Sequence, residues 1–287
     1  MHTTAFFLNM PLAALSAVVW LALAFAIGRL LHRHAIVDVF WGLGFLFIYA
    51  ECLLVSDAWS HSDASPWWSS QPHVLLARML TLIIVAVWSI RLSGHLALRQ
   101  RKGGEDLRYV MILRRAKGKN QTWYAIRWIY LLQAGLLWFV SLTLQWIAFM
   151  PSANLLVLLV GAVVAVKGLS IEALSDWQLR RFLRDSASQA QTMNRGLWHY
   201  SRHPNYFGDA LFWWGAFLIA AASGWGLLMV LSPFAMTKLL TSVSGKPLLE
   251  AKLKKTRQGY LDYVASTSDF FPWPPKQLPV SNIEPTP

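Results

Sequence analysis

The chain has 287 residues, a formal net charge of +12, 55% hydrophobic residues and 14% charged residues. About a quarter of the residues in an ordinary soluble domain are charged, so this composition argues against a soluble protein and indicates a multi-pass membrane protein. The positive charge does not indicate a nucleic-acid partner, because the Lys and Arg residues gather in particular loops, which is how membrane topology is specified. The single cysteine, Cys52, excludes an internal disulfide and a cysteine-based metal site, and we expect no metal.

Apolar segments of about 20 residues, the length that crosses a bilayer, recur along the chain. The first is followed by basic residues and a second apolar segment, so we interpret it as a signal anchor rather than a cleaved signal peptide. The predicted fold class is therefore all-α, a membrane bundle with about seven transmembrane helices. The predicted spans cover 10–31, 36–55, 74–98, 124–148, 153–176, 205–222 and 224–242.

The loops between these spans alternate between basic and non-basic. Lys and Arg fill the loops after the first, third, fifth and seventh spans, whereas the loops after the second, fourth and sixth contain none. Because cytoplasmic loops carry the excess of Lys and Arg, the pattern predicts an outside N-terminus and a cytoplasmic C-terminus. We expect one membrane domain over 1–275, with the cofactor motifs in 120–275, and a disordered tail over 276–287 that is rich in Pro and polar residues.

Ionisable residues inside the second and third spans need a reason, because burying charge in a membrane is costly. Asp38 lies near the cytoplasmic boundary of the second span, and Arg91 and His95 are spaced by four in the third. A group that donates a hydrogen bond where negative charge develops is a strong catalytic device, so Asp38, Arg91 and His95 are the predicted catalytic residues. The structural alternative is an Asp38–Arg91 or Glu51–Arg91 pair that holds the bundle together.

The loop at 104–109 reads Gly-Glu-Asp-Leu-Arg-Tyr and places two carboxylates beside a cation and a phenol. Taken alone, this pattern fits a functional cluster and a solvated helix start equally well.

Two carboxylates follow at the cytoplasmic end of the fifth span. Glu172 and Asp176 are four residues apart, which puts both on one helix face, and Arg180 follows one turn later. One interpretation is a structural ion network between helices. The other is a polar wall of a ligand site, in which the carboxylates accept from ribose hydroxyls and Arg binds phosphate. We favour the second because of the segment that comes next.

The segment 194–209 is polar and basic and runs directly into a Trp-rich apolar span. Pro204 suits the first turn of a helix, whose free N–H groups and partial positive charge favour an anion. Four basic side chains surround this predicted start: Arg195, His199, Arg202 and His203. The pattern predicts a phosphate site at a membrane edge, with Asn205 and Asp209 on one face of the helix. The alternative is an interfacial turn with snorkelling cations.

The C-terminal part contains a basic helix that opens at Glu250, then Tyr263, then an aromatic and Pro-rich stretch at 270–274. One interpretation is an amphipathic helix on the membrane surface. The other is a cap over an adenine or ribose, with Tyr263 stacking on it.

Several of these motifs resemble those of known families. The stretch Arg-His-Pro-Asn-Tyr-Phe-Gly-Asp at 202–209 resembles the signature of membrane sterol reductases of the C14 and C7 type. The Glu-x-x-x-Asp at 172–176 and the ending from Gly-Tyr-x-x-Tyr to Pro-Trp-x-Pro at 259–275 resemble the steroid 5-alpha-reductase C-terminal domain. Over nearly its full length the chain is similar to the bacterial DUF1295 proteins, for which Asp-Val-Phe-Trp-Gly at 38–42 and Glu-Asp-Leu-Arg-Tyr at 105–109 look typical.

The resemblance implies a helical bundle in a bacterial inner membrane that binds NADPH in a cavity facing the cytoplasm. Asn205 and Asp209 match positions that contact the nicotinamide half, and Asp176 matches an acidic residue that faces the cofactor. Arg180 lies among the cationic partners of the phosphates, and Tyr263 matches an aromatic residue near the cofactor. The predicted cofactor-binding set is Glu172, Asp176, Arg180, Arg202, His203, Asn205, Tyr206, Asp209, Glu250 and Tyr263.

Two departures concern the substrate more than the cofactor. Glu172 stands where the steroid reductases have Asn, and the Glu and Tyr with which they bind the steroid ketone have no clear match. The expected function is an integral membrane reductase that uses NADPH and acts on a lipidic enone, such as a steroid or isoprenoid. We expect a lipid-soluble substrate and membrane lipid as partners, no nucleic acid and no obligate protein partner.

Two other functions remain open at this point. Isoprenylcysteine and phospholipid methyltransferases share an Arg-His-Pro-x-Tyr-x-Gly core but bind S-adenosylmethionine. They often carry a Glu-Glu pair further on, where this chain has Leu249 before Glu250. The second is a non-catalytic lipid-binding membrane protein.

Overall fold

The computed structural model describes residues 2–61, 71–101, 104–118, 120–185, 191–243 and 246–277. All of its elements are helices, and an isolated backbone bridge between Gln191 and Gln258 is the one β-type pairing among the described residues. The predicted all-α class is therefore confirmed. The tail predicted to be disordered lies outside the described residues, except for Lys276 and Gln277.

The chain forms two compact units. Unit 1 comprises Met1–Val166 and Trp213–Met236, and unit 2 comprises Lys167–Phe212 and Thr237–Pro287. Three helices, α8, α9 and α10, each contribute one part to either unit. The single domain predicted over 1–275 stays a prediction.

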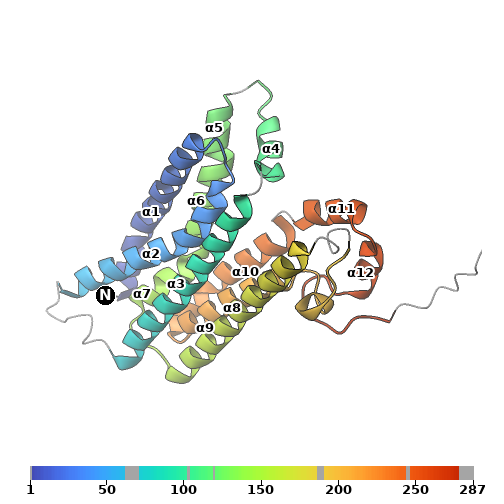
Figure 1. The fold of residues 1–287 in the computed structure, drawn as a ribbon. Coiled ribbons are helices and arrows are strands. Elements are labelled where there is room, and N and C mark those ends of the chain that lie inside the picture. The colour runs from blue at the N-terminus through green and yellow to red at the C-terminus, as the bar shows by residue number, and fades with distance from the viewer. Residues whose placement is uncertain are drawn as a thin grey trace, which may run out of the picture. The chain divides into compact units, whose positions relative to one another are not determined.

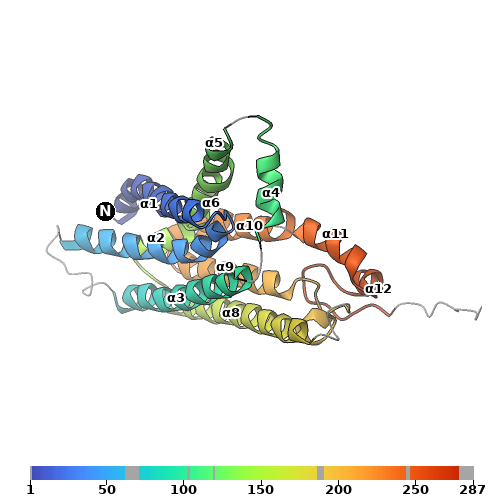
Figure 2. The ribbon, with the colours of Figure 1, turned by 45° about the horizontal axis from the view of Figure 1, so that its top comes forward.

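Unit 1 contains the long apolar helices. Figure 2 shows α2 between α1 and α3, and both neighbours pack on it, while α6 and α7 pack on α1 and α2. Aromatic rings fill its core, where the Phe45 ring lies 4.6 Å from Trp213 and 5.7 Å from Trp88. The elements (Figure 1) are α1 His2–Leu30, α2 Ile36–His61, α3 Pro72–Gln100, α4 Leu107–Arg114, α5 Gln121–Ala125, the π-helix η2 Ile126–Leu131, α6 Leu132–Val140, α7 Leu142–Phe149, the first part of α8 Leu155–Arg184, the last part of α9 Pro204–Ala221, η5 Gly224–Val230 and most of α10 Leu231–Lys238.

Unit 2 contains the predicted cofactor motifs. It is built from the last part of α8, the short 3-10 helix η4 Gly196–His199, the first part of α9, the last two residues of α10, the π-helix η6 Leu239–Val243, α11 Lys246–Thr256 and α12 Tyr260–Ser266.

The helices confirm a multi-pass membrane protein. Those long and apolar enough to cross a bilayer are His2–Leu30, Ile36–Trp59, Pro72–Gln100, Leu155–Arg184 and Gly224–Ser242, and a pair bent by 43°, Gln121–Val140 with Leu142–Phe149, counts as a sixth if it is one span. The predicted number of seven is not reached. The segment left out is α9, which has 18 residues and carries Asn205 and Asp209 in its first two turns, so its apolar part is short. The sidedness of the termini stays a prediction.

Small residues bring α8 and α9 close together. In unit 2, a Cβ added to Gly208 would lie 2.5 Å from the backbone nitrogen of Glu172, and one added to Gly168 would overlap that of Phe212. In unit 1, a Cβ added to Gly161 would lie 2.6 Å from the backbone nitrogen of Ile219. Such contacts let two backbones approach closely in a membrane. In unit 2 they set the acidic face of α8 beside the first turns of α9.

Candidate functional site

The core of the candidate site is a polar contact between α8 and α9 in unit 2. The Nδ2 of Asn205 donates to the Oδ1 of Asp176 over 3.3 Å. Glu172 lies one turn before Asp176, Asp209 lies one turn after Asn205, and these three carboxylic residues are 3–6% exposed. The structure therefore brings the two sequence motifs, 172–176 and 205–209, together as predicted.

Two polar atoms of the residues around the start of α9 are buried and have no hydrogen-bond partner among the described residues. They are the Oδ1 of Asn205, which can only accept, and the Nε of Arg202, which can only donate. Buried polar groups in native proteins are nearly always paired, with protein, water or ligand. These atoms are therefore positions where a bound polar molecule would gain a hydrogen bond.

Arg202 is held by carboxylates of the protein itself. Its Nη1 donates to the Oε1 of Glu250 and its Nη2 to the Oδ1 of Asp269, each over 2.9 Å. Its backbone N–H also donates to the carbonyl of Ser268 over 2.8 Å. Arg202 and Glu250, both predicted to bind cofactor, thus bind each other, and they fasten the start of α9 to α11 and to the C-terminal segment. We call Arg202, Glu250 and Asp269 the arginine clamp.

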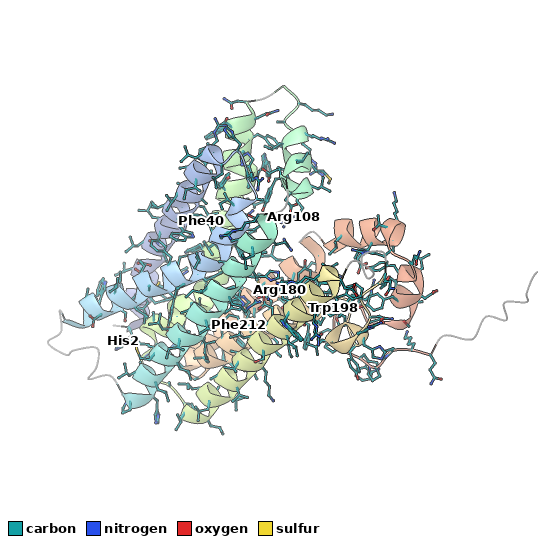
Figure 3. The ribbon with its side chains drawn as sticks, in the orientation of Figure 1. His2, Phe40, Arg108, Arg180, Trp198 and Phe212 are labelled. Atoms are coloured by element: carbon teal, nitrogen blue, oxygen red, sulfur yellow. The ribbon has the colours of Figure 1, made fainter. Side chains whose placement is uncertain are left out.

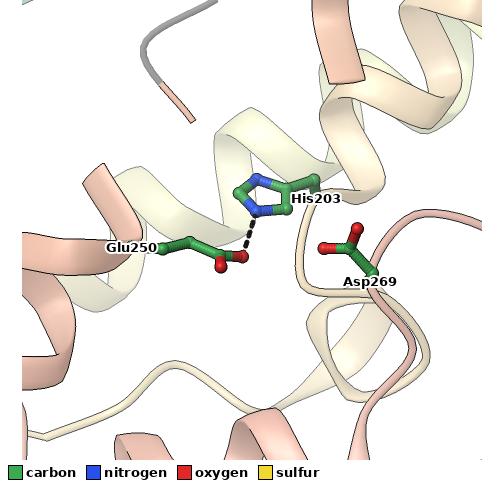
Figure 4. Close-up of side chains that lie close together, drawn as sticks. All are labelled: His203, Glu250 and Asp269. Atoms are coloured by element: carbon green, nitrogen blue, oxygen red, sulfur yellow. Dashed lines mark hydrogen bonds and ion pairs between the residues drawn. The ribbon is translucent and has the colours of Figure 1, made fainter. Parts of the chain in front are cut away.

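His203 extends the clamp. Its Nε2 lies 2.8 Å from the Oε1 of Glu250 (Figure 4). Its ring also stacks on Tyr206, with centroids 5.3 Å apart and planes inclined by 8°. One ligand atom each from His203, Glu250 and Asp269 lie within 4.8 Å of one another, a spacing that a metal ion could bridge. The same two carboxylates already bond to Arg202, whose positive charge would face such an ion. The group therefore fits an arginine clamp better than a metal site.

Tyr263 holds the turn in front of α9. Its hydroxyl donates to the carbonyl of Trp198 over 2.5 Å, and the Nε1 of Trp198 donates to the carbonyl of Ser175 on α8 over 3.1 Å. Burial raises the pKa of Tyr263, so this phenol stays protonated and keeps donating. Its ring is 7% exposed, which makes it a packing residue here; the predicted stacking on an adenine or ribose stays a prediction.

The aromatic C-terminal stretch packs on the same turn. The Oγ of Ser201 donates to the carbonyl of Phe270 over 2.8 Å, and the backbone N–H of Trp273 donates to the carbonyl of Tyr200 over 3.0 Å. Arg180, by contrast, is exposed on α8, one turn beyond Asp176 (Figure 3). Among the three predicted cofactor-binding basic residues, Arg180, Arg202 and His203, Arg180 is therefore the exposed one.

The predicted catalytic residues belong to unit 1, whereas all ten predicted cofactor-binding residues belong to unit 2. Asp38 accepts from the Nη2 of Arg108 and the hydroxyl of Tyr109, each over 2.5 Å. Glu51 accepts from the thiol of Cys52 over 3.4 Å. Asp38 therefore bonds to Arg108 and Tyr109 because α4 folds back onto the start of α2, and a partner found for Glu51 is its neighbour Cys52. Arg91 and His95 are partly buried on α3.

The loop at 104–109 contains a helix start, since Asp106 caps α4, and it is also bonded to the residues before α2. The Glu105 carboxylate accepts from the backbone N–H groups of His34 and Ala35, over 2.5 and 2.9 Å, just before α2 begins. Burial, reinforced by the Asp38 carboxylate, raises the pKa of Tyr109, which keeps its hydroxyl protonated against Asp38. Sequence reasoning missed this cluster. The available signal was that 38–42 and 105–109 are both typical of one protein group.

The long apolar helices define a multi-pass α-helical membrane protein. Its buried polar contacts form a polar site on α8 and α9. Residues 24–267 match the family described as "Protein of unknown function (DUF1295)", and the chain belongs to that family. No curated protein and no solved structure matches the chain.

Proposed function

We propose that this protein is a membrane reductase that uses NADPH to saturate the carbon–carbon double bond of a lipidic enone. In that reaction a hydride is added to the β-carbon, a proton is added to the α-carbon, and NADPH becomes NADP⁺. NADPH, when bound, would supply the hydride. The protein would bind and orient both molecules and supply the proton.

The observation that carries the proposal is the buried Asp176–Asn205 contact, which joins two motifs that resemble those of membrane reductases. The other polar atom of the same amide, the Oδ1 of Asn205, lies outside this hydrogen bond and has no donor among the described residues. The carboxamide N–H of a nicotinamide and the hydroxyls of a ribose are donors of the kind that this oxygen accepts. An unsatisfied buried acceptor costs about 1–3 kcal/mol, so a ligand that donates to Asn205 would recover much of that cost.

The residues around this contact have distinct proposed roles. By accepting from Nδ2, Asp176 fixes how the Asn205 amide is turned and so presents Oδ1 to the ligand. Arg180 is proposed to pair with the cofactor phosphates, since Arg202 is engaged by Glu250 and Asp269. The resemblance already implied that Arg180 is among the phosphate partners, whereas Arg202 and His203, which the sequence also predicted around the phosphate, are not proposed for that role.

The group that polarises the substrate carbonyl is proposed among Asp38, Arg91 and His95. Of these, Arg91 and His95 carry N–H donors, whereas the Asp38 carboxylate accepts from Arg108 and Tyr109. A fixed donor aimed at developing negative charge is typically worth about 3–4 kcal/mol of the barrier.

The binding of NADPH by the purified full chain in mild detergent tests the proposal. Asn205→Ala removes one hydrogen-bond acceptor, worth about 0.5–1.5 kcal/mol, and should weaken NADPH binding by about two- to tenfold. Asn194→Ala is the matched control, because Asn194 lies in the same segment but is exposed. The proposal fails if the wild-type chain does not bind NADPH, or if the two variants bind it equally well.

Parallel titration with S-adenosylmethionine separates the rival functions. A methyltransferase would bind S-adenosylmethionine and not NADPH, and a non-catalytic lipid-binding protein would bind neither. Mass spectrometry of the nucleotides and lipids that co-purify with the chain would identify the substrate class directly.

A further inference from the structure

A second charged feature lies in unit 1, where α4 and α5 stand side by side (Figures 1 and 2). The described residues of 104–131 include five cations and two acids. Both acids are already engaged, Glu105 with backbone N–H groups before α2 and Asp106 with Arg108. The remaining cations of this segment are exposed: Arg114, Arg115, Lys117 and Arg127. Positive charge therefore dominates this surface.

The residues that follow α4 turn the chain and expose these cations. Lys117 and Gly118 both have positive φ values, 35° and 78°, as in a tight turn. Ala116 is buried, with 1% of its surface exposed, whereas its neighbours Arg115 and Lys117 are exposed. The Nη1 of Arg29, at the end of α1, donates to Thr122 over 3.4 Å and adds a further cation next to α5.

Exposed aromatic rings adjoin the cations. Trp123 is 62% exposed and Trp128 is 44% exposed, and the Arg127 guanidinium lies 5.3 Å from the Trp128 ring. Both tryptophans lie in the first turns of Gln121–Val140, part of the bent pair that is apolar enough to cross a membrane. Tryptophan prefers the headgroup level of a bilayer, where its ring is half in lipid and its N–H is hydrated.

We propose that this surface binds the headgroups of anionic phospholipids. We call it the basic collar and define it as Arg114, Arg115, Lys117, Trp123, Arg127 and Trp128. The positive-inside rule would explain the positive charge of this loop but not its exposed tryptophans. The collar combines exposed cations with exposed aromatic rings at the start of an apolar helix. Clusters of Lys and Arg next to a membrane helix attract anionic lipid. A soluble polyanion would satisfy the cations but would offer nothing to the tryptophans.

Native mass spectrometry of the full chain, with phosphatidylglycerol and phosphatidylcholine offered in turn, tests this proposal. The wild-type chain should retain phosphatidylglycerol in preference. The triple substitution Arg114→Gln, Arg115→Gln and Lys117→Gln should weaken that binding by about tenfold or more, since it removes three cations that would lie near the anionic headgroups. Binding should vanish at about 1 M salt, where the Debye length is about 3 Å.

Two further variants decide between the collar and general electrostatic attraction. The triple substitution Lys254→Gln, Lys255→Gln and Lys276→Gln removes the same charge from exposed positions of unit 2 and should leave phosphatidylglycerol binding unchanged. Trp123→Ala keeps the charge and should still weaken binding by a few-fold. The proposal is overturned if both triple variants lose binding equally, or if the wild-type chain shows no preference for phosphatidylglycerol. It is also overturned if neither salt nor heparin, added as a competing polyanion, displaces the bound phosphatidylglycerol.

Discussion

Substituting Arg202 with Gln should loosen the C-terminal half of unit 2. The Arg202 side chain is 10% exposed and that of Glu250 is 16% exposed, so their ion pair is largely withdrawn from water. Removing one partner of such a pair costs about 3–5 kcal/mol when the other charge stays buried without compensation, and here, among the described residues, Glu250 keeps only its contact with His203. The Asp269 side chain is 52% exposed, and a pair of that kind is worth at most about 1 kcal/mol. Allowing for the residual exposure of Glu250, we expect a loss of about 3 kcal/mol.

Hydrogen exchange of the full chain in detergent, followed over 196–203 and 246–277, measures this loss as local opening. A decrease of about 3 kcal/mol should speed exchange of these amides by about 150-fold, since each 1.4 kcal/mol is a factor of ten. Exchange in the core of α2 and α3 should not change. Asp269→Asn is the matched variant and should speed exchange by less than about fivefold. Equal effects of the two substitutions, or no effect of Arg202→Gln, would show that the clamp does not hold this segment.

Three further predictions concern packing, pH and the loop at 104–109. In a thermal unfolding assay, Gly168→Ala should destabilise unit 2 by about 1–3 kcal/mol or more, because the new Cβ would meet backbone rather than a movable side chain. The control Gly94→Ala, whose new Cβ would have nothing within 4 Å, should be neutral or stabilising. Burial raises the pKa of Tyr260 from 10.0 to about 12, so the folded state holds this proton more tightly, and stability present below pH 10 should fall between about pH 10 and pH 12. Tyr260→Phe should flatten that alkaline decline in the unfolding profile, and an unchanged profile would contradict the assignment. Tyr109→Phe removes the hydroxyl that donates to Asp38 and should speed hydrogen exchange over 104–109 by about tenfold, consistent with one hydrogen bond to a charged group; unchanged exchange would mean that Arg108 alone suffices.

Much of the fold follows from local sequence properties. Long apolar runs must form helices in lipid, because every backbone polar group has to be satisfied within the segment. The helical period likewise places Glu172 and Asp176 on one face, and Pro204 marks the helix start that the structure shows at α9. These predictions depend on residues within a few turns of each other, so the sequence alone was sufficient for them.

The number of spans was less predictable, because it depends on how one long apolar stretch bends. The predicted span 124–148 is interrupted by a π-helix and by a 43° bend between Val140 and Leu142. The predicted span 205–222 begins with polar residues, of which Asn205 bonds to Asp176 on α8. Neither feature has a clear signature in the hydrophobic pattern.

The partners of the charged side chains were decided by tertiary structure. Arg202 looked like a phosphate ligand because its neighbours in sequence are basic, yet its carboxylates come from 48 and 67 positions further along the chain. Asp38 likewise bonds to residues 70 and 71 positions away. The sequence alone was sufficient to identify a helical membrane protein and to show which polar and charged residues lie within its predicted membrane segments. Which of them pair was determined only when packed helices brought distant segments within 3 Å, because an ion pair or hydrogen bond depends on separation in space and not along the chain.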